Sequence, residues 1–296
     1  MQIYLKEATG SARQVPRLFK KRGHQQEKTA VSDAPELLFD VNDRGVAHII
    51  LNRPRARNTV SFLMWEQFGA ALDALENATP ARLLIISGAE GYFSNGGDVK
   101  LPPARGEGAL ALAARLEMGQ RIISRVRALP IPTVAAVEGG AFGVSWSLAM
   151  ACDMIFAADD ARFGAPFLDY GLVPDGGAAW FLMRQLGRAR AAEIIFSGRT
   201  LDAAEALSLG LVSRLVIPGT AVDAALALGE TIGGGNAHAV ELTKRLLNQA
   251  EKGDLATTHA LELVYCHACQ AGGEVPRARE MFKARAAAKA ATRAAQ

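Results

Sequence analysis

The stretch GAPFLDYGLVPDGG, residues 164–177, places an acid in an unusual setting. Asp175 stands between Pro174 and two glycines, and mostly apolar residues precede it. An acid here could be a solvated turn residue, the N-cap of a helix starting near Gly177, or a base kept away from water. Local sequence leaves capping and proton transfer equally open. Asp169 is the competing acid, and we expect it to be structural.

Two glycine-rich segments could bind a developing negative charge. The segment GYFSNGGD (91–98) follows an apolar strand pattern, and its glycines allow a backbone to approach a ligand closely. The segment GGAFGVSWS (139–147) also follows a strand pattern and opens a helix, whose first N–H groups favour anions. Each segment alone is also what an ordinary tight turn requires. Donors converging from both would form an oxyanion hole.

Several other chemistries lack their sequence patterns. The chain has no H-E-x-x-H metal motif, no G-x-S-x-G nucleophile elbow, no phosphate-binding Walker loop and no G-x-G-x-x-G dinucleotide motif. We therefore expect no metal site and no nicotinamide or nucleotide cofactor. Cys266 and Cys269 form a single C-H-A-C, which we interpret as two thiols on adjacent turns of one helix.

The elements around these residues alternate between strands and helices. ELLFDVNDRGVAHIILNRP predicts two strands joined by a turn at 42–45, and Ser61 is a candidate N-cap for the helix after it. ARLLIISG, PTVAAVEGG and MIFAA predict buried strands, and a helix is expected over about 108–128. This alternation is typical of an α/β fold with a mainly parallel sheet.

The chain divides into three predicted regions. Residues 1–34 are expected to be a poorly ordered extension, residues 35–218 the α/β core, and residues 219–296 a helical C-terminal region. GGGN at 233–236 is a candidate hinge. No apolar run is long enough to span a membrane.

Bulk composition restricts the partners. The net charge of +3 is too small to argue for nucleic acid, and three cysteines do not make a disulfide framework. The cysteine count favours a reducing compartment, and we expect a cytoplasmic protein that binds neither nucleic acid nor membranes.

Five segments in order resemble the crotonase, or enoyl-CoA hydratase/isomerase, superfamily. They are NRPRARN (52–58), GYFSNGGD (91–98), AAVEGGAFGVSWSLAMACD (135–153), RFGAPFLDYGLVPDGGAAWFLMRQLGRARAAEII (162–195) and LDAAEALSLGLVSRLV (201–216). The resemblance covers residues from about 36 to 250. It implies a crotonase-like ββα spiral core with helical C-terminal elements, an acyl-CoA thioester substrate, no cofactor beyond the coenzyme A of that substrate, and assembly as a homotrimer or a dimer of trimers.

The resemblance also implies roles for particular residues. The backbone N–H groups of Asn95 and Val144 would be the oxyanion donors, and Asp175 would occupy the place of the acid in the single-base isomerases. Where typical hydratases carry two Glu residues, this chain has Ser147 and Phe167. A phenyl ring cannot transfer a proton, so hydration by the two-Glu mechanism is disfavoured.

Further substrate contacts are expected around these groups. The set comprises Gly96, Gly97, Asp98, Gly143, Trp146, Ser147 and Phe167 near the acyl group, and Arg55, Arg57 and Lys283 near the CoA phosphates. Each has a simpler alternative: Asp98 as a cap or loop-ordering residue, Trp146 as core, and the three cations as solvated surface.

The sequence therefore favours double-bond migration from 3-enoyl-CoA to trans-2-enoyl-CoA. Two alternatives stay open. One is another crotonase reaction, such as hydration, or ring isomerisation, hydrolysis or dehalogenation of an aromatic acyl-CoA. The other is a non-catalytic acyl-CoA-binding homologue, to which the unusual Asn95 lends some weight.

Overall fold

The computed structural model describes residues 4–6, 12–14, 35–77, 80–101, 104–108, 111–232 and 236–294. The chain forms two compact units. One comprises residues 1–129 and 133–229, and the other comprises residues 130–132 and 230–296. The first unit contains the predicted α/β core and all the candidate catalytic residues.

A six-stranded sheet forms the centre of the first unit. Its strands, in spatial order, are β11 (Arg214–Val216), β8 (Met154–Ala158), β6 (Thr133–Val137), β5 (Leu83–Gly88), β4 (Val46–Leu51) and β3 (Leu37–Val41). Every neighbouring pair is parallel except the β3–β4 hairpin. The prediction of an α/β fold with a mainly parallel sheet is confirmed.

The Asn42 side chain and backbone together close the predicted β3–β4 turn. The Asn42 Oδ1 atom accepts hydrogen bonds from the N–H groups of Arg44 and Val46, each at 3.0 Å. Gly45 takes a φ of 71°, which favours glycine. The strands that follow are apolar because helices cover the sheet: all five residues of β6 are buried.

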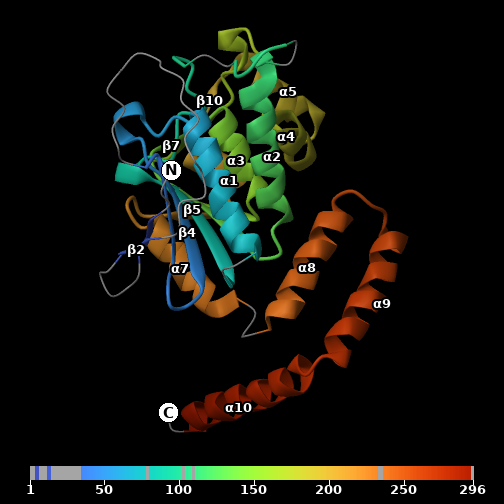
Figure 1. The fold of residues 1–296 in the computed structure, drawn as a ribbon. Coiled ribbons are helices and arrows are strands. Elements are labelled where there is room, and N and C mark those ends of the chain that lie inside the picture. Colours follow the sequence, from blue (N-terminus) through green and yellow to red (C-terminus); the bar gives the residue numbers. More distant parts are fainter. Residues whose placement is uncertain are drawn as a thin grey trace. The chain divides into compact units, whose positions relative to one another are not determined.

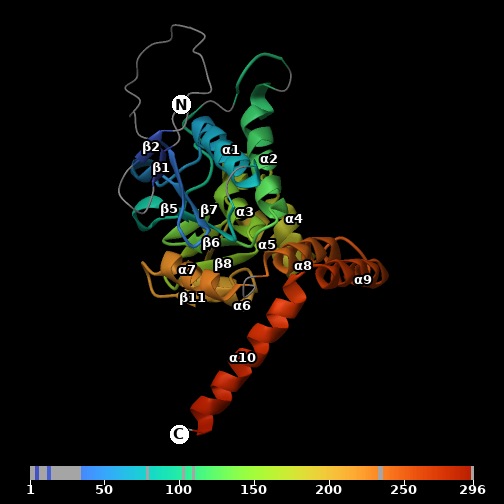
Figure 2. The same ribbon diagram turned by 60° about the horizontal axis from the view of Figure 1, so that its bottom comes forward.

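Helices lie on both faces of this sheet (Figures 1 and 2). The helices of the first unit are α1 (Phe62–Asn77), α2 (Ala114–Ala128), α3 (Val144–Ala151), α4 (Ala178–Leu186), α5 (Arg188–Ser197), α6 (Ala203–Ser208) and α7 (Ala221–Thr231). Figure 2 shows α1, α2 and α3 on one side of the sheet and α7 on the other. The Ser61 cap is confirmed, since its Oγ accepts from Met64 N–H at 3.0 Å. Helix α2 begins six residues later than the predicted 108.

A smaller sheet extends the core beside α3. Its strands are β7 (Gly140–Phe142), β9 (Arg162–Gly164) and β10 (Thr200–Asp202), with β9 in the middle. Short 3-10 turns join the larger elements: η1 (Pro54–Ala56), η2 (Ala89–Gly91), η3 (Ala111–Ala113) and η4 (Leu168–Tyr170). This second sheet holds β7 in place, and β7 leads directly into α3.

The predicted boundary at residue 218 is wrong. Most of α7 belongs to the first unit, because its Gly229 packs directly on the sheet: a Cβ there would stand 2.9 Å from Leu83 Cδ2. In the predicted extension, β1 (Tyr4–Lys6) and β2 (Ala12–Gln14) pair as an antiparallel hairpin. The other residues of 1–34 lie outside the described residues, as do residues 233–235 of the predicted hinge.

The second unit is helical, as predicted. It contains α8 (Ala237–Ala250), α9 (Leu255–Ala271) and α10 (Glu274–Ala294). Lys244 is buried, and its Nζ donates to the Ile131 carbonyl at 2.7 Å within this unit. Cys266 and Cys269 lie on α9 with free thiols, in line with their interpretation. Among the described residues, no helix combines the length and apolar character needed to cross a bilayer.

Candidate active site

The two glycine-rich segments lie side by side as a pair of parallel strands. Ser94 and Ala141 form an isolated parallel bridge, in which Ser94 N–H donates to the Gly140 carbonyl at 3.0 Å and Phe142 N–H donates to the Ser94 carbonyl at 3.1 Å. The Ser145 hydroxyl, in the first turn of α3, also donates to the Ser94 carbonyl, at 2.7 Å. These bonds hold the loop at 94–98 against the start of α3, as the oxyanion hypothesis requires.

Glycines permit this close approach. Gly96 has a φ of 91°, and a Cβ there would stand 2.6 Å from the Phe142 carbonyl oxygen. A Cβ at Gly97 would stand 4.0 Å from Val144 Cγ1. Any side chain at Gly96 would push the two segments apart, so a glycine is needed there.

Val144 is the first residue of α3, and the unusual backbone conformation of Gly143 before it sets the direction of the Val144 N–H. Gly143 has φ 55° and ψ −132°, a conformation that L-amino acids avoid. Within the described part of the chain, no acceptor pairs with the Val144 N–H. A helix N-terminus offers such donors to negative charge, so Val144 fits its predicted role.

The predicted donor at Asn95 needs correction. Its N–H already donates to the Arg57 carbonyl at 3.0 Å, and the Asn95 side chain accepts from the Tyr92 hydroxyl at 2.5 Å. In the same loop, Gly96 N–H donates to Ser94 Oγ. Gly97 N–H, by contrast, has no acceptor among the described residues. Gly97 also lies beside Val144, so Gly97 replaces Asn95 as the second candidate donor.

Asp175 approaches α3 through its backbone. The Ser147 hydroxyl donates to the Asp175 carbonyl at 2.9 Å. Next to it, a Cβ at Gly176 would stand 2.8 Å from Ser147 Cβ, 2.8 Å from Ile123 Cδ1 and 3.0 Å from Val144 Cγ2. The turn at 175–176 is therefore pressed against the same helical turn that carries the Val144 donor.

The Asp175 carboxylate is half-buried, and no residue that the structure describes forms a hydrogen bond with its Oδ1. Burial raises the pKa of this carboxyl group to about 6, while the nearby positive charge of Arg115 lowers it. Such a value suits a base that works near neutral pH.

The capping alternative for Asp175 is wrong. The N-cap of α4 is Gly177, and no side chain accepts a hydrogen bond at that end of the helix. Asp169, the competing acid, is exposed and lies against Gly198, with its Oδ2 3.4 Å from the Cβ that Gly198 would carry. Of the two acids, only Asp175 therefore combines burial with contact to α3.

Phe167 lies next to Gly143, the residue that precedes α3. It is buried, and its ring edge would stand 3.9 Å from a Cβ at Gly143. The ring thus contributes an apolar wall beside the start of α3, next to the Val144 donor. Its contact with an acyl group stays a prediction.

Three predicted substrate contacts have structural roles instead. Asp98 is buried and accepts from Arg53 at 2.9 Å and from Lys100 N–H at 3.1 Å, so it orders the loop after Gly97. The Trp146 side chain is 1% exposed and packs on Phe163 in the core. Ser147 is 0% exposed, and its hydroxyl is committed to the Asp175 backbone.

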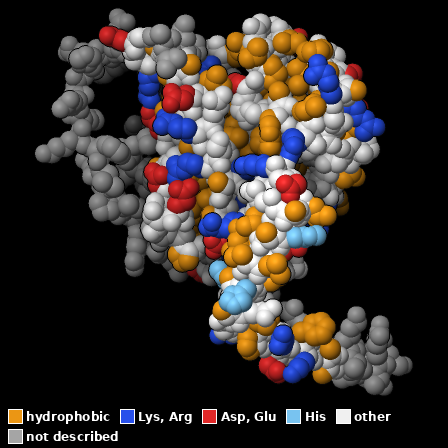
Figure 3. Space-filling model, turned by 90° about the vertical axis from the view of Figure 1, so that its right-hand side faces the viewer, with side chains coloured by type: hydrophobic (Ala, Val, Ile, Leu, Met, Phe, Trp, Pro, Cys, Tyr) orange, Lys and Arg blue, Asp and Glu red, His pale blue; other side chains and the backbone are white. Residues whose placement is uncertain are grey.

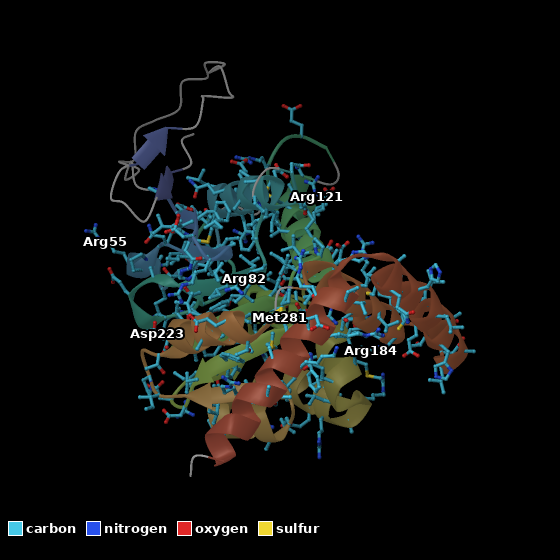
Figure 4. All side chains as sticks on the ribbon, turned by 90° about the horizontal axis from the view of Figure 1, so that it is seen from below. Arg55, Arg82, Arg121, Arg184, Asp223 and Met281 are labelled. Carbon is cyan, nitrogen blue, oxygen red and sulfur yellow. The ribbon has the colours of Figure 1, made fainter. Side chains whose placement is uncertain are left out.

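The predicted phosphate-binding cations remain a prediction. Arg55 and Arg57 are exposed, and Arg55 points outward at the edge of the first unit (Figure 4). The Arg57 guanidinium lies 5.5 Å from the centroid of the Tyr92 ring. Lys283 belongs to the second unit, where it pairs with Glu280.

One functional candidate escaped the sequence analysis. Arg115, on α2, donates to the carbonyls of Asp98 at 2.6 Å and Leu101 at 3.3 Å. Arg115 thereby holds the loop after Gly97, and its positive charge also lowers the pKa of Asp175. No sequence motif marks it, because an arginine near the start of an amphipathic helix is usually a surface residue.

The geometry defines a class of enzyme. Two backbone N–H donors and a half-buried acid near the start of one helix can stabilise a developing oxyanion and move a proton, which are the requirements of acid–base chemistry next to a carbonyl group. Among the described residues, no three His, Cys, Asp or Glu side chains come together as a metal-binding group.

Comparison with known proteins gives the family. The sequence model of the enoyl-CoA hydratase/isomerase family matches residues 42–289, and the chain belongs to that family. Its relatives include "Probable enoyl-CoA hydratase echA8" of Mycobacterium bovis, 35% identical over 221 residues, which are 75% of this chain and 84% of that protein. "Probable enoyl-CoA hydratase echA17" of Mycobacterium avium is 38% identical over 203 residues, 68% of this chain and 77% of that protein.

Solved structures share the fold. The enoyl-CoA hydratase of Bacillus anthracis superposes with a TM-score of 0.79 at 27% identity, covering 84% of this chain and 96% of that chain. A Thermobifida fusca protein solved in complex with acetoacetyl-CoA gives a TM-score of 0.73 at 31% identity, covering 80% and 95%. These matches confirm the predicted crotonase-like fold.

Proposed function

We propose that this enzyme moves the double bond of an acyl-CoA from the 3-enoyl to the trans-2-enoyl position. The observation that carries the proposal is the half-buried Asp175 carboxylate, whose Oδ1 lacks a partner among the described residues and whose turn, at 175–176, packs against the start of α3. The acyl-CoA class is supported by the family and by the relative bound to acetoacetyl-CoA.

In this mechanism the thioester oxygen accepts hydrogen bonds from the N–H groups of Val144 and Gly97. These donors stabilise the negative charge of the dienolate that forms when the C2 proton leaves. One such donor contributes about 2.7–4 kcal/mol to transition-state stabilisation in other enzymes.

Asp175 takes the proton from C2 and returns it to C4. Loss of the C2 proton delocalises the electrons over C1 to C4, and protonation at C4 leaves the double bond between C2 and C3. The acid begins and ends ionised, so the cycle consumes no water, metal or redox cofactor. The apolar Phe167 ring beside the hole favours proton return over attack by water.

Relatives such as those of Mycobacterium bovis and Bacillus anthracis are named as hydratases, yet two side chains of this chain argue against the same reaction here. Ser147 and Phe167 stand where the resemblance places the two hydratase acids. The Ser147 hydroxyl already donates to a backbone carbonyl, and the Phe167 ring has no group that exchanges a proton. These two side chains therefore cannot activate water and protonate carbon between them, as hydration requires. This difference favours isomerisation over hydration.

Replacing Asp175 by Asn tests the proposal. The amide keeps the shape of the side chain but cannot accept the C2 proton, so kcat for a 3-enoyl-CoA should fall by about 10³-fold or more. The readout is conversion to the trans-2-enoyl product, followed at its thioester absorbance.

Asp169→Asn is the matched control, because it neutralises an exposed acid of the same stretch and should leave turnover unchanged. Near wild-type turnover by Asp175→Asn would refute the assignment of the base. Rapid hydration of crotonyl-CoA by the wild-type enzyme would refute the preference for isomerisation. Turnover of aromatic acyl-CoA thioesters alone would point to the ring-isomerase alternative.

We also propose that the chain assembles as a homotrimer or a dimer of trimers. The segment from η4 to α5 exposes large apolar side chains, namely Leu168, Tyr170, Leu172, Val173, Trp180, Met183 and Phe196. Figure 3 shows hydrophobic side chains gathered on one face of the molecule. Exposed large apolar side chains concentrated in one segment are characteristic of subunit interfaces.

A further inference from the structure

We infer that Ser147 is a positioning residue, which sets the place of Asp175 relative to the oxyanion donors. The inference rests on the proposed function, since it concerns the base of that reaction. Its basis is the hydrogen bond from the Ser147 hydroxyl to the Asp175 carbonyl at 2.9 Å.

The Asp175 carboxylate lacks the usual means of orientation. Acids and bases in active sites are commonly held by hydrogen bonds from neighbouring side chains. Here Oδ1 has no partner among the described residues. The position of the carboxylate therefore depends on where the backbone of residue 175 is held.

That backbone is held by two hydrogen bonds and by packing. The Asp175 carbonyl accepts from Ser147 Oγ at 2.9 Å and from Ala178 N–H at 3.0 Å. The bond from Ala178 is local and moves with the turn itself. The bond from Ser147 is the one that fixes the turn to α3, a helix distant in sequence.

One helical turn thus carries both parts of the site. Val144 supplies the oxyanion donor, and Ser147, three residues later, lies on the same side of the helix. Gly176 fits against both, since a Cβ there would stand 3.0 Å from Val144 Cγ2 and 2.8 Å from Ser147 Cβ. All eight residues of α3 are buried, so the spacing between donor and base is set by a rigid element.

Ser147→Ala removes this hydrogen bond to the Asp175 backbone but keeps the carboxylate itself chemically unchanged. We expect kcat for the 3-enoyl-CoA to fall by about 10- to 100-fold with KM unchanged, because small displacements of a catalytic group cost rate rather than binding. Exchange of the C2 proton with solvent deuterium should fall less than isomerisation, because a displaced base still reaches C2 but returns the proton poorly to C4.

Ser87→Ala is the matched control. Ser87 is a buried serine of β5 whose hydroxyl bonds to His48 at 2.8 Å. The control loses a comparable buried hydrogen bond and comparable stability, but it should keep kcat and the exchange-to-isomerisation ratio. Ser147→Cys keeps nearly the same volume with a weak donor and should give an intermediate kcat. If Ser147→Ala does not fold, the kcat of Ser147→Cys tests the positioning role of Ser147 in its place.

Wild-type kcat in Ser147→Ala, or in Ser147→Cys where only that variant folds, would overturn the inference. An equal loss of exchange and isomerisation, matched by Ser87→Ala, would also overturn it in favour of a merely structural role. These outcomes are separable from failure of the proposed function, because Asp175→Asn tests the base directly. An inactive Asp175→Asn with a fully active Ser147→Ala would remove only the positioning role.

Discussion

At the scale of single residues, the site depends on what surrounds one carboxylate. Burial raises the pKa of Asp175, and the positive charge of Arg115 opposes that rise. The balance leaves the acid ionised at neutral pH and still basic enough to remove an activated proton. Arg115 is itself fixed by the carbonyls of Asp98 and Leu101, so its charge acts from a defined place.

The pH dependence of catalysis follows from this balance. Because Asp175 must be deprotonated to act as a base, kcat/KM should rise with pH and level off above an apparent pKa of about 6. Arg115→Gln removes the charge that lowers the pKa of Asp175, so the acid limb should move to higher pH. The measurement is the pH profile of kcat/KM for the 3-enoyl-CoA.

Arg121→Gln is the control for this shift. Arg121 is an exposed arginine on the same helix, labelled in Figure 4, and its loss should leave the profile in place. A loss of rate in Arg115→Gln that is equal at every pH would show that Arg115 only orders the loop at 98–101.

At the scale of elements, the sequence predicted those parts that depend on local chemistry. The strands, the Ser61 cap, the glycine-rich loops and the start of α3 follow from periodicity, capping preference and glycine spacing. The choice between Asn95 and Gly97 could not follow, because it depends on the Arg57 carbonyl in a separate loop. Within the loop at 94–98, the N–H groups of Ser94, Asn95 and Asp98 donate to acceptors that are distant in sequence, which no local pattern reveals.

The same limit applies to Ser147. The sequence shows that position 147 is a serine, so this residue cannot be the acid that a hydratase needs. Its partner is the Asp175 backbone, which lies 28 residues later and reaches α3 only through the folding of the intervening β8 and β9. Long-range partners of this kind depend on tertiary packing and leave no local pattern.

The central sheet contains its own pH-sensitive pair. His48 on β4 bonds through Nε2 to the Ser87 hydroxyl on β5 at 2.8 Å, and burial lowers its pKa to about 4. The unfolded chain binds a proton near pH 6.5, whereas the folded chain does not until about pH 4. Stability should therefore fall as pH decreases through this window.

The expected loss is about 2 kcal/mol in the free energy of unfolding between pH 7.5 and pH 5. Urea unfolding of the wild type and of His48→Gln at both pH values measures it. The neutral glutamine should remove this part of the pH dependence, since all other groups are unchanged. An identical pH dependence in both proteins would contradict the burial of a neutral His48.

At the scale of the whole molecule, the exposed apolar segment from η4 to α5 includes the stretch of chain that carries Asp175, the proposed base. Val173, two residues before Asp175, is 77% exposed, and Phe196 at the end of α5 is 75% exposed. Trp180 and Arg184 on α4 form an exposed cation–π pair at 5.7 Å. If this surface is a subunit interface, assembly also shields the turn that holds the base.

The mass in solution tests this proposal. Sedimentation should give three or six times the chain mass of 31.4 kDa. The double variant Val173→Asp and Phe196→Asp should dissociate to monomers, because buried unpaired carboxylates oppose association. Ile217→Asp, at an exposed apolar residue outside the segment, is the control and should keep the wild-type mass.

The unpartnered Oδ1 atom of Asp175 has a consequence for how the site responds to a change of this acid. Among the described residues, no side chain donates a hydrogen bond to that atom, so a neutral replacement at position 175 breaks no such bond. The frame made by the start of α3 and the loop at 94–98 is held by hydrogen bonds of other residues. We therefore expect the backbone donors of Val144 and Gly97 to keep their places when the acid is changed.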